Sequence, residues 1–317
     1  MQAHFSDQQF PSSATGNRKI VISVVIPHRD TPKALARCLA GFELQNVDFD
    51  YEIIVVDGSK VRPPGVELYP YAELIFDAAK GPGPARNAGA AASRGEIIAF
   101  IDADCLPAPG WLRSLRDAFS HNPEAGAVAG RVDVEPVEGR NWTPCGIFEA
   151  TFAYQQARNV RRLGVAATAN LAVRASAFAQ VGEFSGVDFL EDFEWCQRAA
   201  QARVPLVYAD EVRVRHEPRE TFGALAAKWR RQVYQEHRSH RKSGKAASLF
   251  AWKAMKLAFL TPAVTGYLLT RREHSFADKL RAIPILWRIR AFRVTEMIRL
   301  LRQPDSPRPP WSAPEHE

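Results

Sequence analysis

Two carboxylates follow an apolar run, in the segment Asp102-Ala103-Asp104. The preceding residues, 96–101, read EIIAFI, which is typical of a buried β-strand. Because side chains alternate along a strand, both aspartates are expected to point to the same side, at the edge of a sheet. Such a pair can hold Mg²⁺ or Mn²⁺ and leave coordination positions open for diphosphate oxygens. The alternative is a pair of turn-forming aspartates, because Asp is common where strands end.

A third acid and an arginine could contact a nucleotide. Asp57 ends the apolar run EIIVV at 52–56, where its carboxylate could accept a hydrogen bond from a nucleobase N–H. Asp-Gly-Ser is also an ordinary turn sequence. The GPGP loop at 81–84 opens an Ala-rich helix, so free backbone N–H groups and Arg86 could meet phosphate or ribose oxygens. The alternative there is a proline-started helix with a solvated arginine.

Two more sets of residues could act in catalysis. Glu191 and Asp192 are adjacent acids in an apolar setting that includes Phe193, so burial could raise the pKa of one of them toward that of a useful base. The alternative is that they cap a helix. His216 ends the strand-like segment EVRVRH, where a neutral imidazole could complete a metal site with the two aspartates. A single histidine is more often structural.

The first 120 residues or so alternate strands and helices. Residues 20–27, IVISVVIP, predict a strand that is buried on both faces and stopped by Pro27. Thr31-Pro32 then predicts the start of a helix. Further strands are predicted at 52–56, 72–76 and 96–101, with a helix between the last two. This order predicts a doubly wound parallel sheet whose ligands bind at the carboxyl ends of the strands.

The pattern is looser after Trp111. Helices are expected at 111–120 and 189–202, strands at 127–135 and 170–174, and two short strands in PLVYA and EVRVRH. Loops such as 136–165 are expected to shape the acceptor pocket.

Length and composition favour one folded catalytic domain, since the chain has 317 residues and is 46% hydrophobic. The four cysteines are far apart and match neither a zinc cluster nor a disulfide framework, and the first residues do not read as a secretory signal. A cytoplasmic location is therefore expected. The predicted organisation is a flexible leader at 1–18, a catalytic domain at 19–240 with a nucleotide-binding half (19–120) and an acceptor half (121–240), a basic amphipathic helical region at 241–303, and a Pro-rich tail at 304–317.

The positive charge lies toward the C-terminus. The net charge is +7, yet residues 211–303 hold 21 Lys and Arg against 7 Asp and Glu. No nucleic-acid-binding motif accompanies this charge, so a nucleic-acid partner is not expected. Apolar and basic residues alternate after Ala246, and the longest uncharged run, 257–270, is too short to span a bilayer. This pattern predicts helices lying on the cytoplasmic face of a membrane, near a lipid-linked acceptor. The alternative is helices packed on the catalytic domain.

Taken in order, the segments EIIVVDGS, GPARNAG, EIIAFIDAD, ANLAVRASAF and FLEDFEW resemble the family 2 glycosyltransferases over roughly residues 20–240. The resemblance implies a GT-A fold, with its Rossmann-like mixed sheet flanked by helices. It also implies an enzyme that moves a sugar from a nucleotide-sugar donor to a hydroxyl of a glycan, a lipid-linked acceptor or a polysaccharide precursor. The implied reaction is a metal-assisted single displacement that inverts the anomeric carbon.

The resemblance also implies roles for individual residues. It places the nucleotide at Pro27, Asp57, Ser59, Arg86, Asn87 and Asp102, the divalent metal at Asp102, Asp104 and His216, and the general base at Asp192 with Glu191 as its acidic neighbour. Residues 228–234, KWRRQVY, depart from the Gln-x-x-Arg-Trp motif of the processive synthases, which favours a non-processive enzyme.

Two other functions fit part of this pattern. A sugar-phosphate nucleotidyltransferase also uses acidic metal ligands, but enzymes of that class carry a Gly-rich loop after the first strand. Residues 27–32, PHRDTP, contain no glycine. A non-catalytic sugar-nucleotide-binding protein would keep Asp57 and Arg86 and lose the acid pairs, whereas both pairs are present here.

Overall fold

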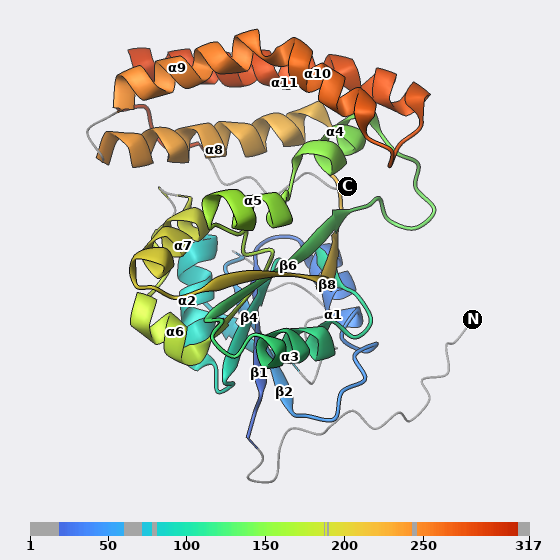
Figure 1. The fold of residues 1–317 in the computed structure, drawn as a ribbon, viewed down its shortest axis with the longest axis vertical. Coiled ribbons are helices and arrows are strands. Elements are labelled where there is room, and N and C mark those ends of the chain that lie inside the picture. The colour runs from blue at the N-terminus through green and yellow to red at the C-terminus, as the bar shows by residue number, and fades with distance from the viewer. Residues whose placement is uncertain are drawn as a thin grey trace.

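The computed structural model describes residues 19–59, 72–77, 81–186, 188, 190–242 and 246–309. The predicted leader at 1–18 and the last part of the predicted tail, 310–317, lie outside the described residues. The chain forms a mixed α/β fold around an eight-stranded sheet with the strand order β3-β2-β1-β4-β7-β6-β8-β5 (Figure 1). Helices flank the sheet, as the predicted fold class requires.

The first half of the sheet is parallel. It consists of β1 (Ile22–His28), β2 (Tyr51–Asp57), β3 (Ala72–Phe76) and β4 (Ile97–Ile101). Nearly every side chain of β1, β2 and β4 is buried, which explains why these strands are continuous apolar runs in the sequence. The predicted doubly wound parallel sheet is therefore confirmed, with strand ends within two residues of the predicted ones.

Helices cover both faces of this sheet. On one face, α1 (Pro32–Ala40) and α3 (Trp111–His121) pack against the even-numbered side chains of β1. On the other face, α6 (Ala175–Val181) and α7 (Glu191–Gln201) pack around Val25 and Phe100. The helix α2 (Pro82–Ala92) also lies against β1 and β2. The core therefore fixes the starts of α2 and α7 above the carboxyl edge of the strands.

The second half of the sheet is mixed. β7 (Asn170–Arg174) runs antiparallel to β4, and β6 (Ala127–Val134) follows it. β8 (Leu206–His216) is one strand where two were predicted, and its pairing with β6 changes register between Gly130 and Arg131. The short β5 (Cys105–Pro107), which was not predicted, pairs with the end of β8.

The prediction of loops over 136–165 was wrong for most of that range. The structure has α4 (Pro144–Phe152) and α5 (Gln156–Leu163) there. The hydroxyl of Thr143 accepts a hydrogen bond from the Gly146 N–H at 3.0 Å, and a proline stands at the first helical position, so α4 has a capped start.

Four helices complete the chain: α8 (Phe222–Lys242), α9 (Ala246–Phe259), α10 (Thr261–Thr270) and α11 (Phe276–Arg302). Figure 1 shows α9, α10 and α11 as a layer above α8 and α4. Leu268 of α10 and Leu286 and Ile289 of α11 share one apolar cluster with Phe148 of α4. The C-terminal helices thus pack on the catalytic fold. Among the described residues, no helix is long and apolar enough to span a bilayer.

Two helical glycines offer a test of the packing between α2 and β1. A Cβ on Gly89 would lie 2.4 Å from Cγ1 of Val25, whereas a Cβ on Gly266 of α10 would meet nothing within 4 Å. Gly266→Ala should stabilise the protein by roughly 0.5–1 kcal/mol through helix propensity. Gly89→Ala should instead destabilise it by about 1–3 kcal/mol, because the overpacked helix must move. Denaturant unfolding of both variants checks this, and a stabilised Gly89→Ala variant would contradict the close packing.

Candidate active site

The predicted chemistry-bearing residues gather around one pocket at the carboxyl edge of the parallel strands. Its cavity volume is about 780 Å³. The pocket lies between the ends of β1 and β4, the starts of α2 and α7, and the side of α8. The predicted residues that line it are Pro27, Arg86, Asp102, Asp104, Glu191, Asp192 and His216. Asp57, Ser59 and Asn87 lie behind this surface.

Asp57 is held by a buried hydrogen-bond network. It pairs in register with His28 of β1, whose Nδ1 lies 3.0 Å from Asp57 Oδ1. The Thr31 N–H donates to His28 Nε2, so Nδ1 is the ring nitrogen that carries the proton. The N–H and hydroxyl of Ser59 donate to the same Oδ1, at 2.9 and 2.6 Å. Within the described part of the chain, the buried Oδ2 of Asp57 has no hydrogen-bond partner, so it is available to a donor from a ligand.

Ser59 and Asn87 hold other elements in place. The hydroxyl of Ser59 also accepts a hydrogen bond from the Asp30 N–H at 2.7 Å, which ties the ends of β1 and β2 together. The side-chain amide of Asn87 donates to the Phe184 carbonyl and accepts from the Phe184 N–H, both at 2.9 Å. Asn87 therefore fixes α2 against the segment that leads to α7.

Arg86 connects the two halves of the site. Its side chain is only 4% exposed, and its guanidinium donates to Asp102 Oδ1 at 2.7 Å and to Glu191 Oε1 at 3.2 Å. Burial works against the charge, but Asp102 and Glu191 together raise the pKa of Arg86 above its usual range. One side chain of α2 thereby links the end of β4 to the start of α7.

Asp102 and Asp104 face different partners. β4 ends at Ile101, and the Cys105 N–H donates to the Asp102 carbonyl at 2.9 Å, so these residues form a turn. Strand alternation therefore does not apply to them, although both line the same pocket. Asp102 contacts Arg86, whereas Asp104 Oδ2 lies 3.2 Å from Nε2 of His216.

His216 reaches Asp104 because of the strand pairing. In the β5–β8 pair, His216 lies directly opposite Cys105, the residue after Asp104. Donor atoms of Asp104, Cys105 and His216 all lie within 4.8 Å of one another. His216 and, to a lesser degree, Arg219 keep the pKa of Asp104 below its usual range despite burial, whereas burial raises the pKa of the Cys105 thiol. A carboxylate and an imidazole fit Mg²⁺ or Mn²⁺, and a protonated thiol contributes little.

Asp192 has the properties of a general base. Burial, then the charge of Glu191, raises its pKa to about 7, although Arg86 opposes this shift. Leu190 holds the N-cap position of α7, and the hydrogen bond that Asp192 accepts among the described residues comes from the N–H of the next residue, Phe193, at 2.8 Å. Simple helix capping therefore does not explain Asp192.

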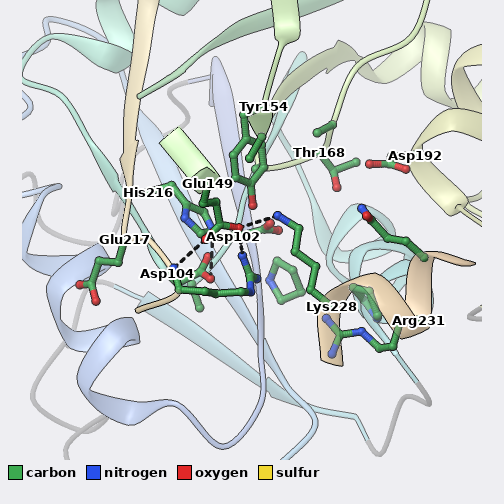
Figure 2. A pocket seen from close by; sticks show the side chains of 18 of the residues that line it. Asp102, Asp104, Glu149, Tyr154, Thr168, Asp192, His216, Glu217, Lys228 and Arg231 are labelled. Carbon is green, nitrogen blue, oxygen red and sulfur yellow. Dashed lines mark hydrogen bonds and ion pairs between the residues drawn. The ribbon is translucent and has the colours of Figure 1, made fainter. Parts of the chain in front are cut away.

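The sequence analysis missed a charged cluster next to the two aspartates. Glu149 of α4 is 1% exposed and accepts three hydrogen bonds of 2.6 Å, from the N–H and guanidinium of Arg219 and from Nζ of Lys228 (Figure 2). These cations hold the pKa of Glu149 below its usual range. The available signal was a single acid inside the apolar stretch CGIFEATF. The cluster places two cations beside the proposed metal site.

Comparison with known proteins identifies the family. Residues 23–182 match the family described as Glycosyl transferase family 2. The chain belongs to this family. It is 31% identical over 220 residues to Glycosyltransferase AglE of Haloferax volcanii, which covers 65% of this chain and 70% of that protein. It is 30% identical over 222 residues to the pre-mycofactocin glycosyltransferase of Mycobacterium tuberculosis, covering 66% of this chain and 45% of that protein.

Among solved structures, the S. aureus TarS 1–349 complex with UDP-GlcNAc aligns over 90% of this chain and 92% of its own, with 16% identity and a TM-score of 0.49. Membership of family 2 makes this protein a glycosyltransferase, class EC 2.4. The family thereby favours sugar transfer over nucleotidyl transfer or binding without catalysis.

The raised pKa of Asp192 predicts a pH-dependent rate. A base acts when deprotonated, so kcat/KM should rise with pH through an apparent pKa of about 7, or lower if a cation is bound nearby. Asp192→Asn should lose this limb of the profile and about 10²-fold or more in kcat, with nucleotide-sugar affinity preserved. Glu194→Gln is the matched control, because Glu194 pairs with Arg198 on the same helix. An unimpaired kcat in Asp192→Asn would assign the base elsewhere.

Proposed function

We propose that this glycosyltransferase moves a sugar from a nucleotide-sugar donor to a hydroxyl of a glycan or lipid-linked acceptor, with metal assistance and inversion at the anomeric carbon. One observation carries the proposal. Arg86 contacts both Asp102 and Glu191. The Asp104–His216 pair, a candidate metal site, and Asp192, a candidate base, therefore share one pocket.

The donor is proposed to bind over the parallel strands. The unpartnered Oδ2 of Asp57 fits a nucleobase N–H, and Pro27 lines the neighbouring wall. Asp104 and His216, with Asp102 nearby, would hold the divalent cation, which offsets the charge that develops on a leaving diphosphate. Burial lowers the pKa of Lys228, whereas Glu149 raises the pKa of Arg219 against the effect of burial. The charge of Asp104 acts on both side chains, so both lie near it and would add positive charge beside the diphosphate.

The transfer is proposed as a single displacement. The acceptor oxygen forms a bond to the anomeric carbon while the bond from that carbon to the diphosphate oxygen breaks. Asp192 takes the proton of the acceptor hydroxyl, and the nucleoside diphosphate leaves with the electron pair of the broken bond. Proton acceptance by a positioned carboxylate contributes roughly 10²–10⁴-fold to the rate. Attack from the face opposite the leaving group inverts the configuration.

Metal dependence tests the proposed ligands. Asp104→Asn keeps the side-chain volume and removes the charge that a hard cation needs, so turnover should fall by about 10²-fold or more at fixed Mn²⁺. Cys105→Ser is the matched control in the same turn, and its metal titration should resemble that of the wild type. Full wild-type turnover in excess EDTA would contradict the metal proposal.

The C-terminal helices are proposed to lie against a membrane surface. Ten of the thirteen exposed large apolar side chains of the described residues lie in the α9–α11 region, nine on the helices and Leu260 between α9 and α10: Leu249, Trp252, Met255, Phe259, Leu260, Tyr267, Phe276, Leu280, Trp287 and Ile298. Exposed Lys256 lies on α9, and exposed Arg272 lies in the connection between α10 and α11. Apolar side chains together with basic ones fit a bilayer that contains anionic lipids.

Vesicle flotation tests this surface. The protein should float with vesicles that contain about 30% anionic phospholipid and remain in solution with neutral ones. Trp252→Ser combined with Phe259→Ser should reduce binding several-fold by removing buried apolar area. Leu44→Ser is the control, because Leu44 is 62% exposed on the catalytic fold. Equal flotation of the double variant and the wild type would rule out these residues as the contact.

A further inference from the structure

The active-site pocket continues past the catalytic acids into a region between α8, α9 and α11. We call this region the basic recess and define it by Arg231, Gln232 and Glu236 of α8, Lys253 of α9 and Arg293 of α11. All five residues line the same cavity as Asp102 and Asp192. None of them belongs to the strands that hold the proposed donor site, so the recess needs another explanation.

The recess contains more positive than negative charge. Three of its residues are cations, and its one acid, Glu236, forms an ion pair with Lys253. The Arg293 guanidinium lies 3.8 Å from the centre of the Trp229 ring, which holds it in place. Its buried Nε has no hydrogen-bond partner among the described residues. A cation that is stacked and left with an unused buried donor can accept an anionic ligand.

The surroundings make these charges costly without a ligand. Burial, followed by the nearby charge of Arg293, lowers the pKa of Lys253 to about 8. Burial and Arg290 lower the pKa of Arg293 to about 9. Burial and Arg219 lower the pKa of Arg231 to about 10. An anion bound among these groups would offset the cost of desolvating them.

The position of the recess favours the acceptor over the donor. Arg231 lies where the charge of Glu191 acts on it, so the recess begins beside the catalytic acids and extends away from them. The donor diphosphate has its own partners around Asp104, including Arg219 and Lys228. Building on the proposed function, we propose that the basic recess binds a phosphate or diphosphate group of the acceptor while the acceptor hydroxyl lies at Asp192.

Matched pairs of ligands test this proposal by calorimetry. Decyl phosphate is compared with decanol, and glucose 1-phosphate with methyl glucoside, on protein saturated with a nucleoside diphosphate and Mg²⁺. At least one phosphate should bind and its uncharged partner should not. Arg231→Gln and Arg293→Gln should each weaken phosphate binding about tenfold or more, since each removes a charge-assisted contact. Arg241→Gln, an exposed α8 residue paired with Asp305, should bind as the wild type does.

The outcomes separate the sources of the phosphate. Binding of decyl phosphate alone identifies a lipid phosphate, and binding of glucose 1-phosphate identifies a sugar phosphate; both support the proposal. The proposal is wrong if neither decyl phosphate nor glucose 1-phosphate binds. It is also wrong if the nucleoside diphosphate displaces the bound phosphate. If Arg293→Gln does not fold, Arg231→Gln and Lys253→Gln carry the test. Binding requires no turnover, so Asp192→Asn should bind the phosphate normally even if the proposed transfer reaction is wrong.

Discussion

The site depends on the buried guanidinium of Arg86. It is the contact that joins Asp102, at the end of the parallel half of the sheet, to Glu191, at the start of α7. Removing it would leave two largely buried carboxylates without their cation. Such a change typically lowers the free energy of unfolding by about 3–5 kcal/mol. Three acids, Asp102, Glu191 and Asp192, act on the guanidinium of Arg86, and Glu191 also acts on Arg231, so acids outnumber cations in this group. This imbalance and burial together explain why Asp192 holds its proton more tightly than an exposed aspartate.

Much of the parallel half of the sheet was predictable from the sequence. Strands buried on both faces require uninterrupted apolar runs, so β1, β2 and β4 are visible without any structure. The carboxyl ends of parallel strands share one edge, and for that reason Asp57 and Asp102 had to come near each other. His216 is a harder case. Its contact with Asp104 needs β5, a strand of three residues with no signal of its own.

The part of the chain after β5 was less predictable because tertiary contacts determine its structure. The apolar face of α4 packs against α10 and α11, more than a hundred residues later in the chain, and no local pattern reports this partner. The Glu149 cluster has the same origin, since its three hydrogen-bond donors, one backbone N–H and two cationic groups, come from Arg219 and Lys228, which follow β8. The turn at Asp102 is a smaller example, in which Asp102 contacts Arg86 and Asp104 contacts His216 although both line one pocket.

The charges that line the pocket are divided between its two ends. Acids from β4 and α7 surround one end, and cations from α8, α9 and α11 line the other. Glu149 neutralises part of this positive charge beside Asp104, and Glu236 pairs with Lys253, one of the three cations of the basic recess. Anions are therefore attracted to the cationic end whether or not the acidic end has been neutralised. Asp192 lies on the acidic side, and its pKa falls whenever the charge of Asp102 and Glu191 is offset. For the proposed role of Asp192, this means that a cation which offsets these charges increases the fraction of Asp192 that is deprotonated near neutral pH.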